Sequence, residues 1–225
     1  MSTSPTYRRT LLLAVANTDP RVAPALDWVE HHLHQKPNTR LYAYCIAEGV
    51  TWLNHPSLQK LKYQGLRVFA CAKSACDHNL PVDNQAIFGG LGLLTDLLLA
   101  TDQFISLCPG SDHPWTPPTN PVPTPPPPQP RLVQISIQHP ESEPENAAEA
   151  LRIATALLAE DRLLIQTSCP QLTLKKWLEI CQHRDQIAAL PQNWQAFTEA
   201  HGTLLTQDSP PLPPHQYPAF AAIPF

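Results

Sequence analysis

The chain has few glycines and few charged residues, and it lacks a long apolar run. Seven of its 225 residues are glycine, and glycine does not recur at every third position, which excludes a collagen-like triple helix. The longest apolar stretch, residues 91–100, is far shorter than the ~20 residues of a membrane span and contains Asp96. The apolar run near the N-terminus ends in Asn-Thr-Asp, which does not fit a signal peptide. We therefore expect a cytoplasmic protein without membrane association.

A basic stripe or an arginine-rich run is also missing. The formal net charge is −4, and 15% of the residues are charged. Residues 1–110 carry +1, residues 111–130 carry −1 and residues 131–225 carry −4. Proteins that bind a phosphate backbone do so with clustered Lys and Arg side chains. The sequence therefore predicts no direct nucleic-acid partner.

The six cysteines have neither Cys-x-x-Cys spacing nor the density of a disulfide scaffold. In a cytoplasmic chain, reduced and mostly buried thiols are the usual state. We expect Cys45 and Cys108 in the core, because they lie within apolar segments, and Cys181 at a buried or marginal position. Of three nearby histidines only His31 and His34 can share a helix face, and a third metal ligand is not evident. The sequence predicts neither a metal nor an organic cofactor.

Proline, in contrast, is abundant and unevenly distributed. Ten of the 27 prolines lie in residues 111–130 and five in residues 209–218. Proline removes a backbone donor and fixes φ, so such segments favour polyproline II and form semi-rigid spacers. We therefore expect a first domain at residues 1–110, a Pro-rich linker at 111–130, a second domain at 131–208, and an extended, poorly ordered Pro-rich tail at 209–225.

The first domain has the pattern of alternating strands and helices. Continuous apolar runs such as residues 10–16 (TLLLAVA) are typical of strands covered on both faces. Strands that alternate with helices imply right-handed crossovers and a mainly parallel sheet. We expect strands at residues 10–16, 40–47, 66–72 and 103–107, and helices that begin at Asp19-Pro20 and that span residues 55–64 and 91–100.

The second domain repeats this order in a weaker form. We expect strands at residues 131–138, 162–168, 186–190 and 203–206, the last at a sheet edge, and helices at 145–160, 172–181 and 195–200. Alignment of the two domains by strand order places Leu190 opposite Cys71. Gly202 is the only glycine after residue 110. We interpret the second domain as a degenerate copy of the first, and an α/β appendage of separate ancestry is the alternative.

Cys71 is the position that most suggests chemistry. It lies at the end of the third expected strand, and ligands of parallel α/β sheets bind beyond the carboxyl ends of strands. A helix that opens at residues 73–75 would place free amides near the thiol, and Lys73 and His78 would add positive charge. Both effects favour a reactive thiolate. The alternative is a buried cysteine that packs as a small hydrophobic residue.

Other residues near Cys71 have two interpretations each. The glycines of residues 89–92 (GGLG) lack the spacing of a phosphate-binding loop. They would let backbone amides approach the Cys71 sulfur, or they would simply allow close helix packing. Cys76 could resolve a disulfide, but packing on the inner face of a short helix is the favoured interpretation. Cys169 ends a strand of the second domain, but the second strand rather than the third.

The stretch LRVFACAKSACDHNLP and the following FGGLGLLTDLLLATDQFISL resemble the DsrE/TusD family of sulfur-relay proteins. Its members have a strand that ends in a cysteine, a short helix, a GLG-type loop that leads into a helix, and an aspartate before the last strand. The similarity covers roughly residues 9–108. The resemblance implies that Cys71 carries the persulfide, that the GLG-type motif is formed by Gly90, Leu91 and Gly92, and that Asp102 is the family's aspartate.

The resemblance also implies an α/β fold of two tandem DsrE-like three-layer units with mainly parallel sheets, the second unit degenerate. It implies a sulfurtransferase-like persulfide carrier, in sulfur oxidation or tRNA thiolation, with sulfur donor and acceptor proteins as partners and a possible homo- or hetero-oligomer with related subunits. The loop after Cys71 departs from the family, since Asp77, His78 and Asn79 replace the usual basic residues and glycine. The alternative function is a non-catalytic scaffold or a small-ligand-binding module whose Pro-rich segments engage a partner.

Overall fold

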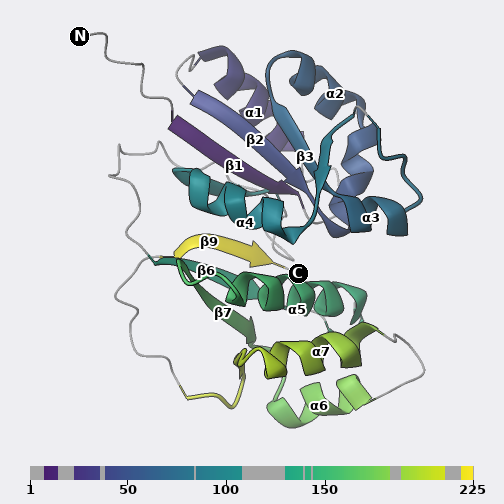
Figure 1. Ribbon diagram of the computed structural model, residues 1–225, viewed down its shortest axis with the longest axis vertical. Coiled ribbons are helices and arrows are strands. Elements are labelled where there is room, and N and C mark those ends of the chain that lie inside the picture. The colour runs from purple at the N-terminus through teal and green to yellow at the C-terminus, as the bar shows by residue number, and fades with distance from the viewer. Residues whose placement is uncertain are drawn as a thin grey trace. The chain divides into compact units, whose positions relative to one another are not determined.

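The protein consists of two compact α/β units, Met1–Pro126 and Pro127–Phe225 (Figure 1). The strand pairings in each unit are parallel. Within the residues that the structure describes, no helix is long and apolar enough to cross a membrane. The computed structural model describes residues 8–14, 23–35, 39–83, 85–107, 130–138, 140–142, 144–182, 189–210 and 219–224.

The first unit contains a five-stranded sheet with the order β4-β3-β2-β1-β5. Its strands are β1 (Arg8–Ala14), β2 (Thr39–Cys45), β3 (Arg67–Cys71), β4 (Ile87–Gly89) and β5 (Gln103–Ser106). Its helices are α1 (Ala23–Gln35), the 3-10 helix η2 (Ala47–Asn54), α2 (Pro56–Tyr63), α3 (Ala72–Asp77) and α4 (Leu91–Ala100). The expected strands are confirmed to within two residues, and β4 and η2 are additions. The expected helix start at Asp19-Pro20 lies outside the described residues.

Helices cover both faces of this sheet. The chain moves in one direction across the sheet from β1 to β4 and then returns past β1 to β5. Right-handed crossovers therefore place α1, α2 and α3 on one face and α4 on the other. Figure 1 shows α1 and α2 on one side of the strands and α4 on the opposite side. The first unit is therefore a three-layer α/β unit.

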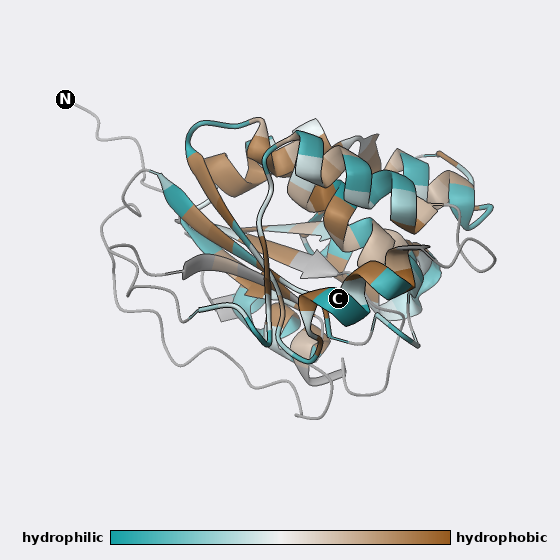
Figure 2. Ribbon diagram, turned by 90° about the horizontal axis from the view of Figure 1, so that it is seen from below, coloured by the Kyte–Doolittle hydropathy of each residue, from teal (hydrophilic) through white to brown (hydrophobic). Residues whose placement is uncertain are grey.

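The side chains of β2 and β3 alternate between these two faces. Ala43, Val68 and Ala70 belong to the core cluster under α1 and α2. Tyr44, Phe69 and Cys71, which alternate with them, are buried but lie outside this cluster. Since successive residues of a strand point to opposite faces, these three side chains lie on the α4 face. Figure 2 shows that the strands are largely hydrophobic, as a sheet covered on both faces requires.

The second unit contains a four-stranded sheet with the order β8-β7-β6-β9. Its elements are β6 (Arg131–Ser136), α5 (Pro144–Leu158), β7 (Leu163–Cys169), α6 (Leu174–Gln182), α7 (Ala189–Glu199), β8 (Leu204–Thr206) and β9 (Ala219–Pro224). The expected edge strand is confirmed as β8. The three helices belong to crossovers that run in one direction, so they cover one face. The described residues between β8 and β9, 207–210, contain no helix, so the described part of this unit does not show the expected third layer.

Two expectations for the second unit are corrected. Residues 189 and 190 were expected in a strand but begin α7, so Leu190 is not the counterpart of Cys71. The tail expected at residues 209–225 contains β9, which pairs with β6 from Leu132 to Ser136. The backbone groups along the free edge of β6 pair with β9. The proline-rich composition of residues 209–225 does not predict this pairing. Residues 183–188, and residues 111–129 of the linker expected at 111–130, lie outside the described residues.

Candidate functional site

Cys71 is the last residue of β3 and pairs in register with Gly89, the last residue of β4. The chain leaves β3 into α3 on one face of the sheet and leaves β4 into α4 on the other face. Ligands of open parallel sheets bind beyond the carboxyl ends of the strands. Cys71 therefore lies at such a position.

The Cys71 side chain is buried. Its residue is 1% exposed, and the alternation along β3 directs it to the α4 face, next to the turn that connects β4 with α4. A thiol this well covered reacts with a group on another protein only after a local opening of the structure. The accessibility of the Cys71 sulfur therefore depends on how readily the surrounding elements open.

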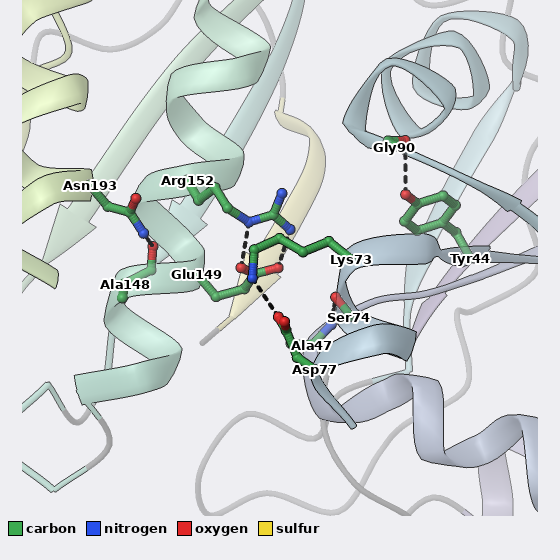
Figure 3. A network of polar contacts seen from close by, with 10 residues as sticks. All are labelled: Tyr44, Ala47, Lys73, Ser74, Asp77, Gly90, Ala148, Glu149, Arg152 and Asn193. Carbon is green, nitrogen blue, oxygen red and sulfur yellow. Dashed lines mark hydrogen bonds and ion pairs between the residues drawn. The ribbon is translucent and has the colours of Figure 1, made fainter. Parts of the chain in front are cut away.

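Ser74 connects α3 with the end of β2. It is a buried residue of α3, and its Oγ accepts a hydrogen bond of 3.0 Å from the backbone N–H of Ala47 (Figure 3). Ala47 follows β2 and has a positive φ of 52°, which non-glycine residues seldom adopt. The hydrogen bond therefore holds an unusual turn beside the strand end that carries Cys71. The sequence offers no signal for this role of Ser74.

The positive charge expected near Cys71 is paired elsewhere. Lys73 forms an i,i+4 ion pair with Asp77, and both side chains are more than half exposed, at 59% and 55% (Figure 3). His78 is exposed at the end of α3. Lys73 and His78 thus lie on the surface of the short helix, whereas Cys71 is buried at its start.

Cys76 differs from the favoured expectation. The sequence placed it on the inner face of the short helix, but the residue is exposed. The buried residues of α3 are Ser74 and Ala75, because a helix of six residues has room for only one inward-facing pair. Cys76 is therefore a surface thiol on the helix that follows Cys71.

The glycine-rich segment combines close packing with an open turn. An added Cβ at Gly89 would lie 2.6 Å from Cδ2 of Leu93, so this glycine allows α4 to pack closely. Added Cβ atoms at Gly90 and Gly92 would meet nothing within 4 Å. The carbonyl oxygen of Gly90, which precedes α4, accepts a hydrogen bond of 3.1 Å from the Tyr44 hydroxyl (Figure 3). It also accepts a hydrogen bond of 3.1 Å from the Leu93 N–H. Sequence reasoning missed Tyr44, which reads as an ordinary residue of a buried strand.

Asp102 lies at the opposite edge of the sheet from Cys71. Its Oδ2 accepts a hydrogen bond of 2.8 Å from the Arg9 N–H, and its own N–H donates to the Arg9 carbonyl at 2.8 Å. These contacts join the amino ends of β1 and β5, whereas Cys71 is at a carboxyl end. The structure therefore does not bring Asp102 together with Cys71.

Three other cysteines are buried, and burial raises their pKa values. Burial raises the pKa of Cys45 and of Cys181 to about 12. Burial likewise raises the pKa of Cys169, against the opposing effect of hydrogen bonds from the backbone of Leu172 and Gln171. Thiols of this kind are protonated at neutral pH and are poor nucleophiles. Cys108 lies outside the described residues, among which no group of three or more His, Cys, Asp or Glu could hold a metal ion.

The chain is similar to known proteins in structure, not in sequence. No protein-family model matches the chain, and no curated protein matches its sequence. Among solved structures, the chain is similar to the ychN protein of E. coli, with 15% sequence identity and a TM-score of 0.38. The alignment covers 44% of this chain and 98% of the ychN chain. A similarity at this level assigns no function.

Proposed function

We propose that the first unit is a sulfur-relay module in which Cys71 carries sulfane sulfur as a persulfide. The observation that supports this proposal is the position of Cys71 at the carboxyl end of β3, beside β4, where the connections leave to opposite faces of the sheet. The resemblance of residues 9–108 to the DsrE/TusD family also supports it, because this resemblance implies a persulfide on the same cysteine. Sulfur donor and acceptor proteins are the proposed partners.

The proposed reaction is thiol–disulfide exchange chemistry applied to a persulfide. The Cys71 thiolate attacks the outer sulfur of a donor persulfide, a new sulfur–sulfur bond forms, and the donor leaves as a thiolate. An acceptor thiolate then attacks the outer sulfur on Cys71, and Cys71 leaves as a thiolate. The sulfane sulfur changes carrier without net oxidation, so neither step needs a metal or an organic cofactor.

We also propose that the second unit is a degenerate copy of the first. The sheet orders support this relation if β6, β7, β8 and β9 take the places of β1, β2, β3 and β5. Among the described residues of the second unit, no strand corresponds to β4. Cys45 ends β2 and Cys169 ends β7, and these residues pair with Ala70 and Thr206 respectively. Gln207 then corresponds to Cys71. The second unit has no thiol at this position and no counterpart of the glycine-rich turn.

The test is to load the full chain with sulfur from thiosulfate or inorganic polysulfide. Intact mass and peptide mapping then locate an added sulfur atom that a reducing agent removes. We expect Cys71→Ser to eliminate this adduct, and Cys76→Ser and Cys169→Ser to retain it. An adduct that survives Cys71→Ser and disappears with Cys76→Ser or Cys169→Ser would move the site and contradict the proposal.

The second candidate is a non-catalytic scaffold or small-ligand-binding module. Two observations favour it: Cys71 is almost fully buried, and the nearby Lys73 is paired with Asp77. A folded wild-type chain that acquires no sulfur adduct from either donor supports this candidate over the sulfur relay.

A further inference from the structure

The Tyr44 side chain spans the strand that carries Cys71. Tyr44 lies on β2, and its hydroxyl donates a 3.1 Å hydrogen bond to the carbonyl oxygen of Gly90, directly after β4 (Figure 3). The strand order places β3 between β2 and β4. Neighbouring strands are about 4.8 Å apart, so a side chain that connects β2 with the end of β4 must extend over β3.

The register shows which part of β3 lies under Tyr44. Tyr44 pairs with Phe69, and Gly89 pairs with Cys71. The Tyr44 ring therefore starts beside Phe69, and its hydroxyl reaches the level of Cys71, two residues further along β3. The side chains of all three residues lie on the α4 face, as the alternation along β2 and β3 requires. Tyr44 thus covers Cys71 on that face, and both residues are buried.

We propose that Tyr44 is a gate that controls access to the Cys71 sulfur. In the closed state, the phenol ring and its hydrogen bond to Gly90 hold the turn between β4 and α4 over the thiol. In the open state this hydrogen bond is broken and the turn moves away. Gly90 has room to move, since even an added Cβ would meet nothing within 4 Å.

The gate explains how a buried cysteine can exchange sulfur with another protein. If the proposed function holds, the closed state protects a persulfide on Cys71 from water and small oxidants, and a donor or acceptor binds when the turn is open. The role of the gate in sulfur transfer rests on the proposed function. The gate itself requires only that Tyr44 shields the Cys71 thiol. Access to the thiol can therefore be measured without any sulfur donor.

The experiment measures alkylation of the native full chain by N-ethylmaleimide, cysteine by cysteine, with peptide mass mapping. Arg67 and Lys73 allow trypsin to release Cys71 on a peptide separate from that of Cys76. Tyr44→Phe removes the hydrogen bond to Gly90 and keeps the ring. Tyr42→Phe is the matched control, because Tyr42 lies on the same strand and face and packs against Phe69 at a ring-centroid distance of 6.1 Å.

We expect Tyr44→Phe to raise the alkylation rate of Cys71 about three- to tenfold, which is the effect of one net hydrogen bond on a local opening equilibrium. Tyr42→Phe should change it less than about twofold. Cys45, buried at the end of β2 on the opposite face, reports global unfolding of the same unit, which the lost hydrogen bond promotes by the same factor. Because the opening of the gate is local, Cys71 should be alkylated faster than Cys45 in the wild type. Equal rates of Cys45 and Cys71 in the wild type, an equal effect of the two tyrosine variants on Cys71, or an unchanged Cys71 rate in Tyr44→Phe would overturn the proposal.

Gly90→Ala tests the gate in the opposite direction with a variant that the fold accommodates. Gly90 has a φ of −93°, which alanine adopts without strain, and its Cβ would have free space. Alanine restricts the open turn more than the closed one, so Cys71 alkylation should slow about two- to fivefold. An unchanged or faster rate would contradict the gate. A chain that fails to load sulfur but shows these alkylation rates refutes the proposed function and leaves the gate intact.

Discussion

The contact between Gly89 and α4 allows a quantitative test of packing at the site. In Gly89→Ala, the new Cβ would lie 2.6 Å from Cδ2 and 3.0 Å from Cβ of Leu93. Rotation of the Leu93 side chain relieves the first contact but not the second, because the Cβ position is fixed by the helix backbone. The end of β4 or the first turn of α4 must therefore move. Overpacking of this kind destabilises a fold by about 1–3 kcal/mol.

Gly92→Ala is the matched control. Gly92 lies in the first turn of α4, and an added Cβ would meet nothing within 4 Å. Alanine exceeds glycine in helix propensity by up to about 1 kcal/mol, so this variant should stabilise the unit by about 0.5 kcal/mol or more. Two substitutions with the same chemistry, three residues apart, should therefore change the free energy of unfolding in opposite directions.

The assay is urea unfolding read by pulsed alkylation of buried cysteines. Cys45 reports the first unit, and Cys169 and Cys181 report the second. With a slope of about 1–2 kcal/mol per molar urea, Gly89→Ala should lower the Cys45 midpoint by about 1 M and leave the other two midpoints in place. An unchanged Cys45 midpoint, or equal shifts of all three cysteines, would refute this account of the contact.

Two further predictions concern hydrogen bonds. Ser74→Ala removes the side-chain acceptor of the Ala47 N–H and should destabilise the first unit by about 1–3 kcal/mol; a Cys45 midpoint equal to that of the wild type would contradict this. Hydrogen bonds from the Thr206 hydroxyl and the Leu174 N–H lower the pKa of Asp208. Its carboxylate therefore stabilises the second unit above the usual carboxyl range, and this contribution is lost as the pH falls through the lowered pKa, on the acid side of about pH 4. Asp208→Asn should remove this part of the acid sensitivity in thermal melts followed by circular dichroism, and identical pH profiles for both chains would contradict it.

The elements that carry a strong local signal can be predicted from the amino-acid sequence. The apolar runs at β1, β2 and β3 predict strands buried on both faces, because a parallel sheet covered by helices on both sides needs hydrophobic residues at every position. The same logic placed Cys71 at a strand end. The edge position of β8 also followed from the order of elements. These predictions succeed because the periodicity of side chains along one segment is a local property.

Elements whose partners lie far away in sequence become evident only in the folded chain. β4 has three residues and β9 follows a proline-rich segment, so neither has a periodicity that predicts a strand. Each exists because a neighbouring strand, β3 or β6, offers unpaired backbone groups. The prediction of a strand at residues 186–190 is wrong for residues 189 and 190, which begin α7. A short apolar run fits the periodicity of a strand and that of a helix, and the packing of the unit favours the helix here.

The environment of the candidate site likewise depends on the folded chain. The sequence predicted positive charge around Cys71 and an inward-facing Cys76, but Lys73 pairs with Asp77 on the surface and Cys76 is exposed. Tyr44 lies 27 residues before Cys71 in the sequence and covers it through a hydrogen bond to Gly90, 46 residues away from Tyr44. Residue type and spacing fix which groups are available near a strand end. Which of them meet depends on strand order and register, and these are properties of the folded sheet alone.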